Sequence, residues 1–269
     1  MQNAALQDRR IDLQYTRLHI KPEELDEALA LIRENEFVGV NVTVPHKQRA
    51  FELMDECDQH ATDVGAVNTV AIRDEKLIGF NTDGAGFARA IREDFSVDLK
   101  DLRVLIIGAG GVARAIAFEC GKEGCERLVI ANRTTDRAAN LVKQLQKFFI
   151  GPKVLGPVSR LQAIGLSESE LRRQVPHTDL LVNATSLGLD RSDPLPIGTH
   201  LLEPHLMIYD TVYLPRRSPL LLAAEQTGAR AANGLSMLLH QGARAFEIWF
   251  GREPPIGVMR AALQSEITY

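Results

Sequence analysis

The sequence predicts an α/β protein with two domains, one of them built on a doubly wound parallel sheet. Short runs of β-branched residues alternate with amphipathic segments along almost the whole chain, which is typical of parallel strands joined by helices. The length of 269 residues is greater than that of a typical single small domain, which favours two domains. The apolar run at 104–107 leads directly into glycines and then a helix-forming segment, as in parallel α/β sheets.

Composition indicates a globular enzyme with a small-molecule partner. A hydrophobic fraction of 45% and a charged fraction of 25% are ordinary for a protein with a packed core. The formal net charge is -4, so the chain lacks the excess of positive charge that would attract nucleic acid. We see no signal peptide, no membrane-spanning run and no C-x-x-C pair among Cys57, Cys120 and Cys125. We therefore expect a cytoplasmic protein without a metal site, as a monomer or homodimer.

The first third of the chain is expected to form a smaller α/β domain. Asp74 and Glu75 separate two runs in which apolar and polar residues alternate. This pattern indicates a β-hairpin, and Asp83 follows its second strand. Pro45 marks the start of a helix that ends near Met54. From alternation and helical periodicity we predict strands at residues 13–19, 39–44, 68–73 and 76–80, and helices at 22–35 and 84–92.

The polar stretch 93–101 is the predicted boundary between the domains. Beyond it, strands at 104–107, 128–131, 153–155, 180–183 and 207–210 alternate with helices up to about Gly234. The helical segments 235–250 and 255–267 have no strand after them, so we expect them to pack back on the first domain. The predicted domains are therefore residues 1–98 plus 236–269, and residues 99–235.

The most informative motif is the glycine turn after the first strand of the second domain. Gly108 suits a tight turn, Gly110 lets a pyrophosphate approach the backbone, and Ala113 allows close packing of helix on strand. A G-x-G-x-x-A is also compatible with a plain turn, but here strand, turn and helix follow one another. We predict a Rossmann-type dinucleotide site formed by Gly108, Ala109, Gly110, Gly111, Val112 and Ala113.

The residues after the next strand indicate which dinucleotide binds. NAD enzymes usually place an acid there to accept from the ribose hydroxyls, whereas this chain has Asn132, Arg133 and Thr134, with Arg137 further on. The two arginines could clamp a 2′-phosphate through charge-assisted hydrogen bonds, or could be solvated residues at a helix start. The turn upstream favours the first interpretation, and we predict NADP as the cofactor.

Candidate catalytic residues follow strands of the first domain. Thr43 lies at a strand end, and Lys47 lies in the first turn of a helix, where a cation opposes the helix dipole. Asn68 and Asp83 begin or follow strands. Each of these residues alone is also typical of a solvated surface, a turn or a cap. Ketone reduction needs a proton donor for the developing alkoxide, and a lysine beside a carboxylate is chemically adequate.

A series of motifs runs through the chain in the order N-V-T-V-P-H-K, G-A-V-N-T, N-T-D-G-A-G, G-A-G-G-V-A, A-N-R-T, N-A-T-S-L-G and M-L-L-H-Q. Together they resemble the shikimate dehydrogenase family. The resemblance implies reversible, NADP-dependent reduction of 3-dehydroshikimate to shikimate in a cleft between the domains, with Lys47 and Asp83 as the catalytic pair. It implies substrate contacts from Thr43, Asn68, Asp83, Tyr213 and Gln241, and cofactor contacts from Thr185, Ser186, Thr211, Gly234 and Met237.

The sequence departs from the family at its start. There, a first strand precedes S-x-S-P, whose serines hold the substrate carboxylate, and a segment resembling M-H-N-A-A follows. This chain opens on Met1, Gln2 and Asn3, inside that motif. We therefore expect a sheet one strand short, with an exposed edge, in a chain that binds NADP but turns over poorly. A quinate/shikimate dehydrogenase-like paralogue and a non-catalytic NADP-binding module are the open alternatives.

Overall fold

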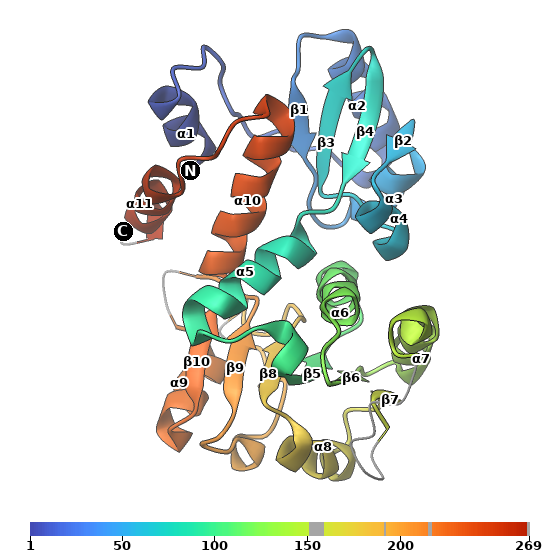
Figure 1. Cartoon of the computed structure of the whole chain (residues 1–269), viewed down its shortest axis with the longest axis vertical. Coiled ribbons are helices and arrows are strands. Elements are labelled where there is room, and N and C mark those ends of the chain that lie inside the picture. Colours follow the sequence, from blue (N-terminus) through green and yellow to red (C-terminus); the bar gives the residue numbers. More distant parts are fainter. Residues whose placement is uncertain (151–158, 191, 215–216, 268–269) are drawn as a thin grey trace. The chain divides into compact units, whose positions relative to one another are not determined.

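Two sheets organise the chain, one in each of the two compact units into which it divides (Figure 1). The computed structural model describes residues 1–150, 159–190, 192–214 and 217–267. The first unit is Met1–Gly86 with Leu238–Tyr269, and the second is Phe87–Met237. This division falls inside two helices, α5 (Asp83–Phe95) and α10 (Leu235–Phe250). The domain limits expected from the sequence, after residues 98 and 235, stay a prediction.

The sheet of the first unit has four strands in the order β1-β3-β4-β2. The predicted hairpin is confirmed: β3 (Thr69–Arg73) and β4 (Lys76–Phe80) pair antiparallel around Asp74 and Glu75, both with positive φ. β1 (Gly39–Asn41) pairs only with β3, at one edge, and β2 (Glu56–Cys57), which the sequence did not predict, pairs with β4. Three helices pack on this sheet: α2 (Leu25–Glu34), α3 (Lys47–Glu52) and α4 (Gln59–Val64). The 3-10 turn Pro22–Glu24 precedes α2. Leu29, Ala50 and Ala61 of the helices share a buried core with Val70 and Leu77 of the strands.

The C-terminal half of α10 belongs to the first unit. Its Ala243 and Phe246 pack with Leu6 of α1 (Gln2–Asp8) and with Met259 of α11 (Ile256–Ile267). Further along, Trp249 donates its indole N–H to the carbonyl of Val70 at 2.9 Å, which joins the helix to β3. Burial of this apolar helix face against α1 and α11 supplies the driving force for the contact.

The strand predicted at residues 13–19 is wrong, since that segment pairs with no sheet. Its backbone instead uses a side chain: the N–H of Tyr15 donates to Oδ1 of Asn3 at 2.7 Å, and Nδ2 of Asn3 donates to the Tyr15 carbonyl at 2.9 Å. An alternating pattern forms a strand only where a neighbouring strand completes the ladder. The strand predicted at 39–44 is shorter than expected, ending at Asn41.

The sheet of the second unit is entirely parallel, in the order β10-β9-β8-β5-β6-β7. The first strand, β5, lies in the middle of the sheet; β6 and β7 are added on one side of it, and β8, β9 and β10 on the other. This is the strand order of a doubly wound Rossmann sheet. The strands are β5 (Arg103–Ile107), β6 (Arg127–Ala131), β7 (Leu161–Ile164), β8 (Leu180–Asn183), β9 (Met207–Asp210) and β10 (Arg230–Asn233).

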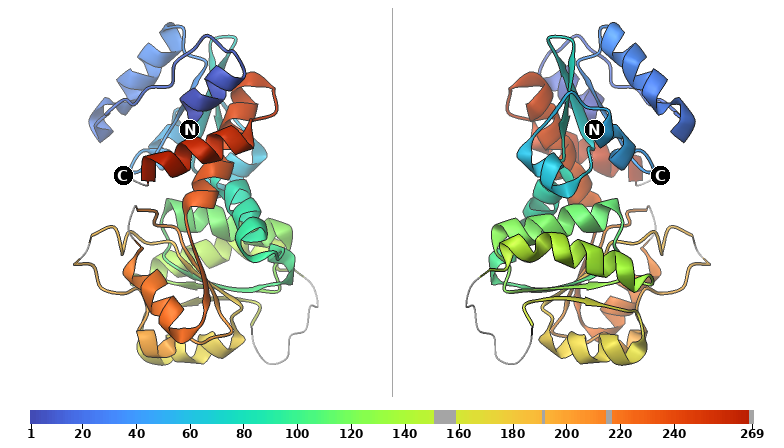
Figure 2. Two further views of the ribbon diagram at one scale, coloured as in Figure 1. Left: turned by 90° about the vertical axis from the view of Figure 1, so that its left-hand side faces the viewer. Right: turned by 90° about the vertical axis from the view of Figure 1, so that its right-hand side faces the viewer.

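Helices cover both faces of this second sheet (Figure 2). One face carries α6 (Gly111–Glu123) and α7 (Thr135–Leu145), and the other carries α8 (Glu168–Gln174) and α9 (Pro219–Thr227). The core between the layers includes Leu105, Val129, Leu181, Ile208 and Leu220. This two-sided burial explains why the central strands are continuous apolar runs.

Two strands of this sheet differ from the prediction. The strand expected at residues 153–155 lies outside the described residues, and β7 occupies the position beside β6. β10 was not predicted, because Arg-Ala-Ala-Asn has neither β-branched nor aromatic residues. Among the described helices, none combines the length and the apolar character needed to cross a membrane.

Candidate active site

Lys47 and Asp83 form a buried ion pair in the first unit. Nζ of Lys47 lies 2.7 Å from Oδ2 of Asp83, and the two side chains are only 12% and 7% exposed. Lys47 begins α3, and its carbonyl accepts from the N–H of Val67, just before β3. Asp83 begins α5, where a carboxylate is favoured by the helix dipole. The pair thus joins the starts of two helices, and it is the arrangement expected of a positioned proton donor.

Asn68 and Gln241 extend this pair into a polar cluster. Nδ2 of Asn68 donates to Oδ1 of Asp83 at 2.9 Å and lies 3.4 Å from Oε1 of Gln241 on α10. Oδ1 of Asn68 accepts from the backbone N–H of Thr82 at 2.8 Å. Both oxygens of Asp83 are therefore engaged, one by a cation and one by an amide. Thr82 was missed in the sequence, although its place beside Asp83 in N-T-D-G was a usable signal.

Thr43 lies close to Lys47 along the chain but outside the bonded cluster. It is exposed, and its carbonyl accepts from the N–H of His46 at 2.9 Å. It lines a cavity of about 410 Å³ together with Asn41, His46 and residues of α2. The lining of this cavity includes neither Lys47 nor Asp83.

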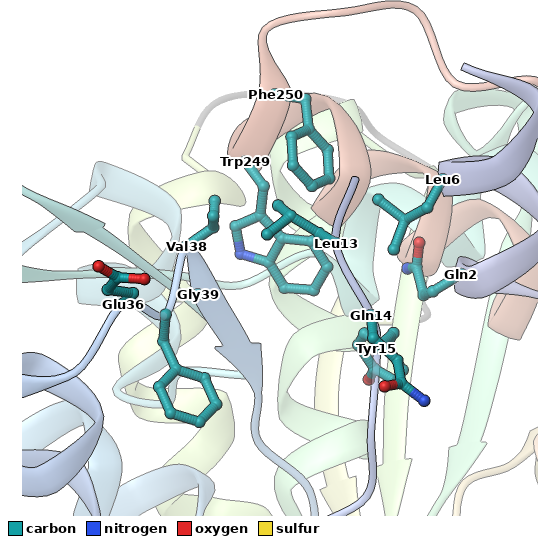
Figure 3. Close-up of a pocket in the computed structure, with 11 residues that line it drawn as sticks. Gln2, Leu6, Leu13, Gln14, Tyr15, Glu36, Val38, Gly39, Trp249 and Phe250 are labelled. Atoms are coloured by element: carbon teal, nitrogen blue, oxygen red, sulfur yellow. The ribbon is translucent and has the colours of Figure 1, made fainter. Parts of the chain in front are cut away.

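A second cavity of the first unit lies away from the ion pair. It has a volume of about 290 Å³, and Figure 3 shows Trp249 and Phe250 of α10 together with Gln2 and Leu6 of α1 around it. Its lining includes neither Lys47 nor Asp83, and it is mainly apolar. We therefore do not assign it to the catalytic cluster.

The glycine turn of the second unit has the predicted geometry. Gly108 follows β5 with φ of +120°, a conformation that glycine adopts readily. α6 begins at Gly111, and Ala113 is fully buried. A β-carbon added at Gly110 or Gly111 would meet nothing within 4 Å, so the backbone there faces open space. The first N–H groups of α6 are thus accessible to an anion.

The residues expected to select NADP follow β6. Asn132 donates from Nδ2 to the carbonyl of Thr134 at 2.8 Å, which orders the turn into α7, and Thr134 is the N-cap residue. Arg133 and Arg137 are exposed, and within the described part of the chain neither forms an ion pair with a carboxylate. Arg133 lies between β6 and α7 and Arg137 lies in the first turn of α7, so two exposed guanidinium groups near this strand end can bind a phosphate.

The remaining predicted cofactor residues lie at the carboxyl end of the second sheet. The N–H and Oγ1 of Thr211 both donate to the Asn183 carbonyl, at 3.0 and 2.8 Å. Gly234 packs on Thr211 so closely that an added β-carbon would lie 2.3 Å from the Thr211 carbonyl oxygen. Half-buried Thr185 and exposed Ser186 follow β8, and Met237 is buried. Tyr213, which was predicted to contact substrate, is 43% exposed.

No group of three or more His, Cys, Asp or Glu side chains in the described segments is arranged to hold a metal ion.

Family models of shikimate dehydrogenase domains match three parts of the chain. "Shikimate dehydrogenase substrate binding domain" matches residues 1–70, "Shikimate / quinate 5-dehydrogenase" matches 89–161, and "Shikimate 5'-dehydrogenase C-terminal domain" matches 234–264. The shikimate dehydrogenase (NADP(+)) of Methanopyrus kandleri is 42% identical over 265 residues, covering 98% of this chain and 89% of the relative. That of Moorella thermoacetica is 40% identical, covering 98% and 87%.

Solved structures of dehydrogenases have a similar fold over nearly the whole chain. Shikimate dehydrogenase from Thermus thermophilus, in complex with NADP(H) and shikimate, superposes with a TM-score of 0.84 at 32% identity, covering 98% of this chain and 92% of that one. Quinate dehydrogenase from Corynebacterium glutamicum, in complex with NAD, has a TM-score of 0.78 at 30% identity, covering 95% and 84%. The chain belongs to the shikimate dehydrogenase family.

Proposed function

We propose that this protein is an NADP-dependent shikimate dehydrogenase that reversibly reduces 3-dehydroshikimate to shikimate. The observation that carries the proposal is the buried ion pair of Lys47 and Asp83, 2.7 Å apart and tied to Asn68. Relatives named shikimate dehydrogenase (NADP(+)) at 32–42% identity over nearly the whole chain support the same substrate and cofactor.

The residues of the second unit fit NADP. The open space at Gly110 and Gly111 is a cradle that a β-carbon would fill, and it leaves helix N–H groups for the pyrophosphate. Arg133 and Arg137 would bind the 2′-phosphate, with Asn132 and Thr134 shaping their turn. When bound, NADPH supplies the hydride for the substrate carbonyl carbon.

Lys47 would act as the proton donor and acceptor. During reduction, Nζ gives a proton to the carbonyl oxygen as negative charge develops there, and during oxidation it takes that proton back. Asp83 keeps the ammonium oriented through the 2.7 Å contact. We assign Thr43, Asn68, Tyr213 and Gln241 to hydrogen bonds with the hydroxyl and carboxylate groups of the substrate.

The proposal is tested by following NADPH formation from shikimate and from quinate. Wild-type protein is expected to turn over shikimate with NADP⁺, and Lys47→Ala to lose about 10²–10⁴-fold in kcat. Lys76→Ala is the matched control, because Lys76 also pairs with an acid in the first unit but is 57% exposed. Normal activity of Lys47→Ala would remove the assignment.

Quinate oxidation is the second candidate activity. The match to "Shikimate / quinate 5-dehydrogenase" and the likeness to a quinate dehydrogenase favour it. A kcat/KM with quinate above that with shikimate would establish this alternative. NADP binding with turnover of neither compound would instead indicate a non-catalytic module. We also propose a cytoplasmic location, because Cys57, Cys120 and Cys125 are all free thiols.

A further inference from the structure

Asp210 is a buried carboxylate that the proposed function does not use. It ends β9, is fully buried, and lies in register with Asn183, the last residue of β8. Both residues thus reach the carboxyl edge of the sheet, where doubly wound folds bind their ligands. Oδ1 accepts from Nδ2 of Asn183 at 2.9 Å and from the N–H of Val212 at 3.1 Å, and Oδ2 accepts from Oγ of Ser218 at 2.5 Å.

The environment of Asp210 is costly for a carboxylate. Burial raises the pKa of Asp210, and the hydrogen bonds from Ser218, Val212 and Asn183 offset this only in part. Within the described residues, no Lys, Arg or His forms an ion pair with it. Burial therefore disfavours the charged form of Asp210, and acids with a perturbed pKa occur frequently at functional sites.

The contact with Asp210 fixes the orientation of the Asn183 amide. An ionised carboxylate only accepts hydrogen bonds, so the amide nitrogen of Asn183 must face it. The amide oxygen then faces the opposite way, where it accepts from the N–H and the Oγ1 of Thr185 at 3.2 and 2.7 Å. The nitrogen also donates to the Leu187 carbonyl at 3.1 Å, so all four hydrogen-bonding positions of the amide are used.

The loop held by Asn183 lies against the glycine turn. The N–H of Ala184 donates to the Ile107 carbonyl at 2.9 Å, immediately before Gly108. A β-carbon at Gly108 would lie 2.7 Å from the Ala184 carbonyl oxygen, so the loop and the turn are in direct contact. The position of Thr185 relative to the turn therefore depends on the Asn183 amide, and through it on Asp210.

We propose that Asp210 is a positioning residue for the cofactor: by orienting the Asn183 amide it holds Thr185 beside the turn Gly108–Ala113 for NADP. This inference rests on the proposed function, since it takes NADP as the ligand of that turn. Asp210 is assigned an indirect role because it is fully buried and its hydrogen bonds come from Asn183, Val212 and Ser218. Its role is to select one of the two orientations of an amide whose flipped form would withdraw the acceptor from Thr185.

The test measures the NADP⁺ dissociation constant by calorimetry, together with kcat and both KM values. Asp210→Ala is expected to weaken NADP⁺ binding about tenfold, equivalent to about 1.4 kcal/mol, with kcat at saturating NADP⁺ and KM for shikimate nearly unchanged. Asp210→Asn should restore most of the affinity, because its amide oxygen can still accept from Asn183. If Asp210→Ala does not fold, Asp210→Ser replaces it, since the hydroxyl keeps a partner for Val212.

Asp179→Ala is the matched control. Asp179 is a partly buried acid of the same unit, bonded to Arg103 at the amino end of the sheet, so its loss should affect stability but leave NADP⁺ affinity unchanged. Thr185→Val completes a double-mutant cycle. If Asp210 acts through Asn183 on Thr185, the loss caused by Asp210→Ala is smaller in the Thr185→Val background.

The outcomes separate this inference from the proposed function. Wild-type affinity in Asp210→Ala, a loss equal to that of Asp179→Ala, or strictly additive losses in the cycle would each overturn the positioning role while leaving the proposed function intact. A wild-type protein that does not bind NADP⁺ overturns the proposed function first, and the role of Asp210 with it.

Discussion

Gly86 of α5 lies directly against Gln241 of α10. A β-carbon added at Gly86 would lie 2.8 Å from both the backbone nitrogen and the β-carbon of Gln241. We predict that Gly86→Ala destabilises the protein by about 1–3 kcal/mol, because overpacking outweighs the better helix propensity of alanine. Chemical denaturation measures the change, and kcat should fall as Gln241 moves away from Asn68.

Gly257→Ala is the control for this substitution. Gly257 lies in α11, and a β-carbon there would meet nothing within 4 Å. Alanine should therefore stabilise the protein, by about 0.4–1 kcal/mol. Equal effects of the two substitutions would show that the contact between Gly86 and Gln241 is unimportant.

Arg133 and Arg137 should determine the choice between NADP and NAD. We predict that Arg133→Ala and Arg137→Ala each raise KM for NADP⁺ by about tenfold or more, given charge-assisted bonds of about 1.5–3 kcal/mol, with little effect on KM for NAD⁺. Arg172→Ala serves as the control, since Arg172 is an exposed arginine of the same unit that pairs with Glu168. An unchanged ratio of the two KM values in both variants would contradict the assignment.

Asp179 should contribute to acid sensitivity. Burial alone would raise its pKa, but hydrogen bonds from the Arg103 side chain and backbone outweigh burial, and the pKa of Asp179 lies below its ordinary 3.8. A depressed pKa in the folded state contributes stability that is present above 3.8 and is lost as the pH falls through the lower folded value. Asp179→Asn should therefore lose stability at neutral pH and show a smaller further loss on acidification. Parallel pH dependences of the two unfolding free energies would contradict this.

The sequence predicted those parts of the fold whose signals are local. Asp74 and Glu75 between two alternating runs were enough for the β3–β4 hairpin, and the apolar run before Gly108 was enough for β5 and α6. The strand at residues 13–19 failed because a strand needs a partner that no local pattern supplies. β10 was missed for the opposite reason: parallel pairing with β9 imposes the strand on Arg-Ala-Ala-Asn, which has little strand propensity.

The candidate site shows the same limit. Lys47 and Asp83 were named from the chemistry of their residue types and from family resemblance, and the fold places them in contact. Gly86 was not named, since its role depends on the approach of α10, which is far away in the sequence. Thr82, whose N–H donates to Asn68, was not named although it directly precedes Asp83. Asp210 was visible only as the end of a strand. Its importance depends on the orientation of one amide, and a sequence pattern does not encode that orientation.

We propose that Lys47, held by Asp83, transfers the proton. The most direct test compares kcat for shikimate oxidation at saturating NADP⁺ in Lys47→Ala and Lys76→Ala, with NADP⁺ affinity measured for both. We predict a loss of about 10²–10⁴-fold in Lys47→Ala at unchanged NADP⁺ affinity, with Lys76→Ala close to wild type. A Lys47→Ala protein that oxidises shikimate as fast as Lys76→Ala would contradict it.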